Sequence, residues 1–343
     1  GPLWCILGSA GTTSVPLRNI ARWDLLVRSI ARRKVELVDP PCGLSFDLSA
    51  FTAFGGMKTI MKFAYSTNAY MRFPFEEAVS RIAALGYAGL ELLADVPHAW
   101  PMNLLPGDVE RIRGVLERHG MAISNVNAFM MRGVNDPRQP YWYPSWIEPD
   151  PFYRAIRREH TKRALALAAE LGAPGIQTEP GGPIPPGMSR QHAYRIFYDE
   201  LMPCVEVAEQ LGVNLLIEPE PGLLIERFEQ FLEFFGRIDS PAVGLNFDIG
   251  HAFCVGQAPE EWIPTMARYT RHYHIEDISS LRVHHHLIPG EGAIDFAAVL
   301  KAIQATHYSG WVTVELYPYI DDPDVAGRKA LQFLQHMEQS IVE

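Results

Sequence analysis

Four side chains, each at the end of a short apolar run in the second half of the chain, have the chemistry to bind a divalent cation. They are Glu218, Asp248, His274 and Glu315, called the metal quartet below. Carboxylate oxygens with one imidazole nitrogen suit Mn²⁺, Mg²⁺, Co²⁺ or Zn²⁺, and the quartet offers no thiolate that would select copper or an iron-sulfur cluster. The sequence therefore predicts one divalent ion as cofactor, with Mn²⁺ the expected metal.

The composition is that of a globular enzyme. The 343 residues are 48% hydrophobic and 20% charged, and no apolar run approaches the roughly 18 residues that span a bilayer. The net charge of -10 disfavours nucleic-acid binding, which needs clustered Lys and Arg. Four scattered cysteines show no CxxC spacing. We therefore expect a cytoplasmic protein that binds a small-molecule substrate, not nucleic acid or a membrane.

The first 60 residues differ from the rest of the chain. Residues 1–56 hold six basic and four acidic residues and lack a regular alternation of strand and helix patterns. The Gly1-Pro2 start resembles an expression-vector remnant, and Met57 or Met61 is a plausible natural start. The Arg-rich opening also resembles a transit peptide, although its acidic residues argue against one. We expect residues 1–60 to be a non-native or unessential extension and residues 61–343 to form a single domain.

From residue 62 onward, strand and helix patterns alternate. The expected strands are 62–67, 88–94, 122–128, 175–179, 213–218, 242–248, 272–274 and 310–315. The expected helices are 75–85, 106–119, 152–171, 189–211, 225–238, 259–269, 296–305 and 324–342. Eight such units predict a (β/α)8 TIM barrel. The alternative, a doubly wound sheet, needs a Gly-rich phosphate turn after its first strand, and residues 66–69 (Ser-Thr-Asn-Ala) are no such turn.

In barrels of this kind the chemistry lies at the carboxyl ends of the strands, where the metal quartet falls. The motifs around the quartet resemble, in their order, those of the xylose-isomerase-like TIM-barrel superfamily. Within it, the sugar isomerases and epimerases of the ketose 3-epimerase and inosose dehydratase kind are the most similar by pattern. The matching segments are 217–219 (IEP), 247–251 (FDIGH), 274–277 (HIED), 289–296 (PGEGAIDF) and 314–315 (VE).

The resemblance implies roles for the individual residues. The metal quartet would bind one ion, Glu218 and Glu315 would also move the substrate's proton, and His251 would contact the substrate. A cation stabilises the enediolate that forms when a proton leaves the carbon beside a carbonyl, and carboxylates on both faces can take and return that proton. The expected activity is isomerisation or epimerisation of a sugar, inosose or related polyhydroxylated carbonyl compound. Dehydration of such a substrate, an inosose or 3-dehydroshikimate, is the alternative.

Further polar residues near predicted strand ends are candidates for substrate binding: Glu91, Asn127, Glu179, Glu220, Arg282 and His286. Ketose 3-epimerases tend to place a Glu and an Arg where this chain has Leu224 and Ser280, so Glu226 and Arg282, two residues further on, are expected to replace them. Ligand histidines need an outer partner that fixes their tautomer, and Glu276 is expected to serve His274.

Two other functions remain as alternatives. His284-His285-His286 resembles the loop that supplies ligands for additional zinc ions in the endonuclease IV branch, so a multi-zinc phosphodiesterase is considered. The net charge of about -12 without residues 1–56 disfavours it, because such an enzyme needs a basic face. A barrel that lost catalysis is disfavoured by the intact carboxylates. A homodimer or a homotetramer is the expected assembly.

Overall fold

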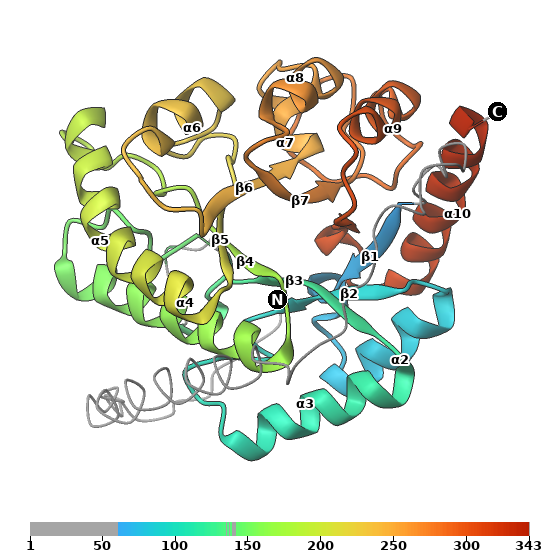
Figure 1. Ribbon diagram of the computed structural model, residues 1–343, viewed down its shortest axis with the longest axis horizontal. Coiled ribbons are helices and arrows are strands. Elements are labelled where there is room, and N and C mark those ends of the chain that lie inside the picture. The colour runs from blue at the N-terminus through green and yellow to red at the C-terminus, as the bar shows by residue number, and fades with distance from the viewer. Residues whose placement is uncertain (1–60, 135, 137, 139–141, 343) are drawn as a thin grey trace, which may run out of the picture. The chain divides into compact units, whose positions relative to one another are not determined.

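The computed structural model describes residues 61–134, 136, 138 and 142–342, which contain a closed barrel of eight parallel strands (Figure 1). The strands are β1 (Lys62–Ser66), β2 (Gly89–Leu93), β3 (Ala122–Asn127), β4 (Gly175–Thr178), β5 (Asn214–Ile217), β6 (Val243–Asp248), β7 (Thr270–Ile275) and β8 (Trp311–Val314). Each strand pairs with its sequence neighbour, and β8 pairs with β1. The predicted (β/α)8 fold is confirmed. The predicted extension lies outside the described residues.

Helices alternate with the strands and surround the barrel (Figure 1). They are α2 (Phe75–Leu85), α3 (Pro106–His119), α4 (Pro151–Leu171), α5 (Arg190–Leu211), α6 (Phe228–Phe235), α7 (Ile249–Cys254), α8 (Pro259–Met266), α9 (Phe296–Ala305) and α10 (Pro323–Val342). Short 3₁₀ turns are η3 (Thr67–Tyr70), η4 (Arg132–Val134) and η5 (Tyr317–Tyr319). In the described part of the chain, none of the helices has the length and apolar character needed to cross a membrane.

The predicted helices are present with small shifts, and α7 was not predicted. α6 begins three residues later than expected, at Phe228, and ends at Phe235. α7 has only six residues, too few for its periodicity to be seen in the sequence. Asp248 is the last residue of β6 and also the N-cap of α7. Because no loop separates β6 from α7, the strand and the helix together fix the position of Asp248.

The helices pack on the barrel through the apolar stripe that the sequence pattern predicts. In α2 the buried positions are Phe75, Ala78, Val79 and Ile82, which share one helical face. The helix ends at Leu85 and is capped by Gly86, whose φ of 96° is readily adopted only by glycine. Other helices, such as α3, α5 and α9, also bury apolar side chains. The helical layer therefore packs on the strands whose ends carry the site residues.

A chain of polar contacts crosses the barrel interior below the metal quartet. The hydroxyl oxygens of Ser124 and Thr313 lie 2.9 Å apart, and Thr313 Oγ1 is 2.8 Å from His272 Nε2. His272 Nδ1 donates to Asn246 Oδ1 at 2.7 Å, and the Asn246 amide nitrogen lies 3.2 Å from His274 Nδ1. Buried polar groups need such partners. His272 therefore supports the floor of the site and is not directed at the quartet's carboxylates.

Candidate active site and metal centre

The four residues of the metal quartet meet at the carboxyl end of the barrel. Glu218 follows β5, Asp248 ends β6, His274 lies in β7 and Glu315 follows β8, and all four are buried. One potential ligand atom from each lies within 4.8 Å of the others. His274 Nδ1 is 2.7 Å from Glu218 Oε1 and 3.8 Å from both Asp248 Oδ2 and Glu315 Oε2. The predicted residues thus form one compact cluster.

The two oxygens of Asp248 have different environments. Oδ1 accepts the backbone N–H of His251 at 2.7 Å and so caps α7. Oδ2 is buried and has no hydrogen-bond partner among the described residues. A buried carboxylate oxygen without a donor is costly unless a cation faces it. Three carboxylates and one imidazole around this oxygen fit a divalent ion, with the metal quartet as its ligands.

Glu91 is the outer partner of His274. Its Oε2 lies 2.8 Å from His274 Nε2, so that nitrogen donates its proton to Glu91 while Nδ1 faces the quartet's carboxylates. The sequence analysis assigned this role to Glu276, and that assignment is wrong because Glu276 lies beside Asp248. A carboxylate behind a ligand histidine orients the ring and makes its free nitrogen a stronger ligand.

Replacing Glu91 with glutamine is expected to weaken Mn²⁺ binding by about 10- to 100-fold. Glutamine keeps the size of the side chain but removes the charge that orients His274 and raises its basicity. The measurement is Mn²⁺ affinity by titration calorimetry. Glu200→Gln, a partly buried glutamate paired with Arg154 and Arg158 on the helical layer, is the matched control. Equal affinities for the two variants would contradict this role of Glu91.

The cluster carries protons that an ion must displace. Burial, together with the charges of Asp248 and Glu91 and against the attraction of His274, raises the pKa of Glu218 to about 7. Burial also raises the pKa of Glu315 well above its usual value. Burial opposes the charge on His274, but the carboxylates of Glu91, Glu218 and Glu315 raise its pKa well above normal. These protons occupy the atoms that would ligate a cation.

The affinity of the site for Mn²⁺ is therefore expected to rise with pH. The ion binds the deprotonated ligands, so raising the pH removes competing protons, by about tenfold in affinity per pH unit for each proton released. With the pKa of Glu218 at about 7, the rise should be clear between about pH 6 and about pH 8. Calorimetry in buffers of different ionisation enthalpy gives the number of protons released. A flat affinity over this range would contradict the assignment.

Glu276 is a buried residue whose carboxyl group lies next to Asp248 of the metal quartet. Neither of its oxygens accepts a hydrogen bond from another described residue. Burial and the charge of Asp248 raise its pKa well above its usual value, so it is held in the protonated form beside Asp248. It lies over Gly250, where an added Cβ would come within 1.9 Å of Glu276 Oε1. The glycine of the Asp-Ile-Gly-His segment is thus needed to accommodate Glu276.

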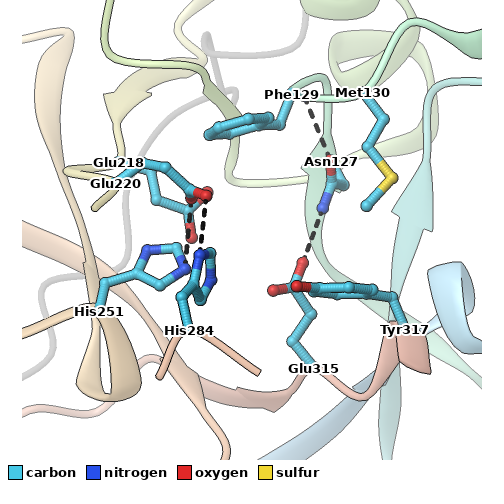
Figure 2. A pocket seen from close by; sticks show the side chains of 9 residues that line it. All are labelled: Asn127, Phe129, Met130, Glu218, Glu220, His251, His284, Glu315 and Tyr317. Atoms are coloured by element: carbon cyan, nitrogen blue, oxygen red, sulfur yellow. Dashed lines mark hydrogen bonds and ion pairs between the residues drawn. The ribbon is translucent and has the colours of Figure 1, made fainter. Parts of the chain in front are cut away.

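A pocket opens beside the quartet (Figure 2). It is lined by Asn127, Phe129, Met130, Glu218, Glu220, His251, His284, Glu315 and Tyr317. In Figure 2, the carboxylates of Glu218 and Glu220 lie with the two histidines on one side, and Glu315 and Tyr317 lie on the other. Burial lowers the pKa of His251 and His284 to about 3, so both rings are neutral. The pocket has polar walls and an apolar edge, as a site for a small polar molecule requires.

Three predicted substrate contacts, Asn127, Glu220 and His251, line this pocket, whereas Glu91 and Arg282 do not. Glu91 lies behind His274, because the register of β2 against β3 shifts between Leu90 and Glu91. Such an irregularity redirects the side chains that follow it. The Arg282 guanidinium packs over the Phe253 ring at 4.8 Å.

Two further candidates, Glu179 and His286, are buried and are not among the residues that line the pocket. Glu179 accepts the backbone N–H groups of Trp146 and Gly181, and so holds two loops together. His286 donates from Nδ1 to the Glu315 carbonyl oxygen at 2.9 Å. Their buried positions depend on long-range contacts that strand-end spacing does not reveal.

Sequence reasoning missed several residues that shape the site. Asn68 donates from Nδ2 to Glu315 Oε1 at 2.8 Å, and Asn127 donates to the same oxygen at 3.2 Å. These two amides fix the orientation of a predicted catalytic carboxylate. The position of Asn68 just after β1 is the signal that could have indicated it. Tyr317 lies two residues after Glu315 in the loop that follows β8.

The apolar edge of the pocket is held by a buried arginine that the sequence analysis did not single out. Arg157 on α4 donates to the carbonyl oxygens of Ala128, Phe129, Trp142 and Pro144. These residues belong to the long connection between β3 and α4, and Phe129 lines the pocket. A guanidinium with its five donors can join several carbonyls at once. Arg157 thus fixes the loop that bears Phe129.

The family model of the xylose isomerase-like TIM barrel matches residues 79–337. The chain belongs to this family. Among curated members, an inosose dehydratase from Clostridium beijerinckii is 23% identical over 76% of this chain and 89% of that protein. A fructoselysine 3-epimerase from Shigella flexneri is 25% identical over 79% of this chain and 96% of that protein. Relatives that span the barrel thus include a dehydratase and an epimerase.

Solved structures of other proteins share the fold. A D-tagatose 3-epimerase-like protein superposes with a TM-score of 0.68 at 23% identity, over 82% of this chain and all of that chain. The IOLI protein with a bound zinc atom gives 0.67 at 18% identity, over 82% of this chain and 99% of that one. At these identities the likeness establishes the architecture, and the reaction must be argued from the site.

Proposed function

We propose that this chain is a divalent-metal-dependent epimerase or isomerase that acts on a sugar, inosose or related polyhydroxylated carbonyl compound by proton transfer. The observation that carries the proposal is the placement of Glu218 and Glu315 on opposite sides of one pocket (Figure 2). An oxygen of each lies within 3.8 Å of His274 Nδ1. A carbon held between two carboxyl groups can lose its proton to one and regain a proton from the other.

The protonation of these two carboxyl groups supports the proposed reaction. Burial raises the pKa of Glu218 to about 7 and raises that of Glu315 well above its usual value. A group that titrates near neutral pH serves as base in one step and as acid in the next. A single pair can therefore run the reaction in both directions, with one carboxyl group protonated while the other is charged.

The metal quartet would hold the ion, which supplies Lewis-acid stabilisation of the negative charge that grows on the substrate oxygen. The residues of the chain do the rest. The amides of Asn68 and Asn127 hold Glu315 in place. Glu220, His251 and His284 offer polar contacts to hydroxyl groups, and Phe129 with Tyr317 gives the apolar surface. This set favours a small uncharged polyol over a phosphate ester, because no lysine or arginine lines the described pocket.

Dehydration is the second candidate, and one observation favours it. Glu218, whose pKa is raised to about 7, lies on the same side of the pocket as Glu220, His251 and His284, so a leaving hydroxyl on this side can be protonated (Figure 2). The first step, removal of the proton beside the carbonyl, is common to both reactions. The fate of the intermediate distinguishes them.

The test is a screen of ketoses, inososes and 3-dehydroshikimate in D₂O with Mn²⁺, followed by NMR. An epimerase or isomerase is expected to place deuterium on the carbon beside the carbonyl and to form a second sugar. A dehydratase is expected to form an unsaturated product. Exchange with none of these compounds, in protein shown to contain its metal, would overturn the proposal.

A further inference from the structure

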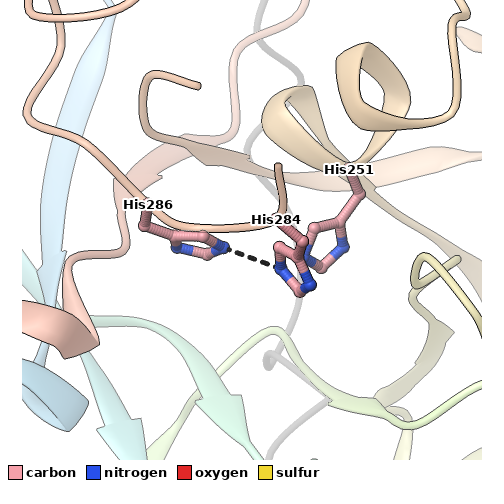
Figure 3. Close-up of side chains that lie close together, drawn as sticks. All are labelled: His251, His284 and His286. Carbon is pink, nitrogen blue, oxygen red and sulfur yellow. Dashed lines mark hydrogen bonds between the residues drawn. The ribbon is translucent and has the colours of Figure 1, made fainter. Parts of the chain in front are cut away.

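The loop between β7 and α9, residues 276–295, brings two histidines to the site. His284 lines the pocket next to His251 of α7, and the centres of the two rings lie 4.7 Å apart. His286 donates from Nδ1 to the Glu315 carbonyl oxygen at 2.9 Å. Figure 3 shows the three rings close together, with His284 and His286 on the loop. The position of this loop therefore decides where part of the pocket wall lies.

Asp277 joins the two ends of this loop. Its Oδ1 accepts the backbone N–H groups of Ile278 at 2.9 Å and Ile294 at 3.1 Å. Its Oδ2 accepts those of Gly290 at 2.9 Å and Gly292 at 2.8 Å. A carboxylate has about four acceptor sites, so this buried side chain uses its full capacity on the loop backbone. Four donors from the start and the end of the loop thus depend on one residue.

Backbone pairing connects this closure to the histidines. Asp277 and Leu287 exchange two backbone hydrogen bonds, of 2.8 and 2.7 Å, as an isolated antiparallel bridge. The Ala293 N–H donates to the Ile278 carbonyl oxygen at 2.8 Å. The loop therefore leaves the barrel and returns to it at one place. Because Leu287 directly follows His286, the bridge also fixes where the histidine segment returns.

The second half of the loop encloses the Asp277 carboxylate closely. An added Cβ on Gly292 would lie 2.3 Å from Asp277 Oδ1 and 2.4 Å from the Ile278 carbonyl oxygen. Only glycine fits there without displacing the carboxylate. The Pro-Gly-Glu-Gly segment, residues 289–292, supplies two of the four N–H donors, and none of its residues lines the described pocket. The segment is thus explained by its contact with Asp277.

We propose that Asp277 is a positioning residue for substrate binding: it closes the loop and so holds His284 in the pocket wall. The inference rests on the proposed function, because it concerns the same pocket. Asp277 does not line the pocket and acts through the loop. The Glu315 carboxyl group has its own support from the amides of Asn68 and Asn127. Loss of the Asp277 contacts should therefore weaken substrate binding and leave metal binding and proton transfer in place.

The test is Asp277→Asn in Mn²⁺-loaded protein. Asparagine keeps one acceptor oxygen, but its amide nitrogen is a donor and would face two backbone N–H groups. Amides of residues 278–294 are expected to exchange with D₂O about tenfold faster, measured by mass spectrometry. With the compound that exchanges deuterium in the screen above, KM should rise about tenfold, while kcat and Mn²⁺ affinity stay within about twofold. Asp295→Asn, which removes a carboxylate that caps α9, is the matched control and should change none of these values.

Gly292→Ala disturbs the same contact from the other side and should reproduce the faster exchange and the higher KM. Its control is Gly107→Ala, where an added Cβ meets no atom within 4 Å. Thermal melts identify any variant that fails to fold, and a variant that is merely unstable should lose kcat without a rise in KM.

Unchanged loop exchange in Asp277→Asn, faster exchange without a rise in KM, or a fall in kcat alone would overturn the proposal. The proposed function would stand in each case, because the screen tests it on wild type. If the screen finds no active compound, the proposed function fails, and the exchange measurement still decides whether Asp277 closes the loop.

Discussion

Replacement of Glu315 with glutamine is expected to slow inversion of the substrate's carbon by about a thousandfold, because a positioned base contributes about 10²- to 10⁴-fold. Glutamine has the same shape and keeps an oxygen toward the metal quartet, but it cannot take up a proton at neutral pH. The measurement is conversion of one epimer to the other in D₂O, with bound Mn²⁺ quantified in the same sample. Loss of inversion with metal retained would assign the proton transfer to Glu315.

Glu218→Gln is the partner experiment, and Glu233→Gln is the control. If the two carboxyl groups serve opposite faces, each variant should still exchange deuterium into the epimer whose proton faces the remaining carboxylate. Inversion should be lost in both. Glu233 is a partly exposed glutamate on α6 that pairs with Arg237, so its replacement should leave the rate unchanged. Normal inversion by either site variant would refute the two-carboxylate mechanism.

Asp248→Asn is expected to weaken Mn²⁺ binding by about 100-fold or more, a larger loss than an outer partner causes. Asparagine is as good a helix cap as aspartate, so α7 should keep its first turn. The variant removes charge from the oxygen that has no hydrogen-bond donor among the described residues. The measurement is free Mn²⁺ by electron paramagnetic resonance during titration.

Asp295→Asn is the matched control for this change. Asp295 caps α9, where its Oδ1 accepts the Ala298 N–H at 3.0 Å, and it belongs to none of the potential metal-binding groups found among the described residues. Both variants replace a capping aspartate with asparagine, so any effect on helix stability should be similar. Mn²⁺ affinity should fall only in Asp248→Asn. Equal affinities would show that the metal quartet is wrongly assigned.

The architecture was predictable because each unit repeats the same local signals. Amphipathic segments such as 75–85 end at a glycine, and the next apolar run begins within a few residues. Eight repeats of this pattern are best satisfied by a closed parallel barrel. The helix that was not predicted, α7, has only six residues, and so short a segment shows too little periodicity to be recognised.

Within the site, the direction of individual side chains was harder to predict than their position along the strands. Glu220 and His251, which are predicted substrate contacts, line the pocket. Glu91, one layer deeper, lies behind His274 instead, and the register shift in β2 sets its direction. Glu276 occupies the space above Gly250 rather than the place behind His274. Side-chain direction near an irregularity cannot be derived from spacing alone.

The sequence by itself determined the type and order of the metal quartet and the barrel that brings its members together. It could do so because parallel strands of a barrel all end at one rim, so the order of strand ends implies their convergence. Only the tertiary structure decided which groups face one another. The contacts of His251 with Pro219 and of His286 with Glu315 join segments about 30 residues apart. Such contacts depend on loop conformations and on buried charges. Both involve segments that are distant in the sequence, so spacing along the chain does not predict them.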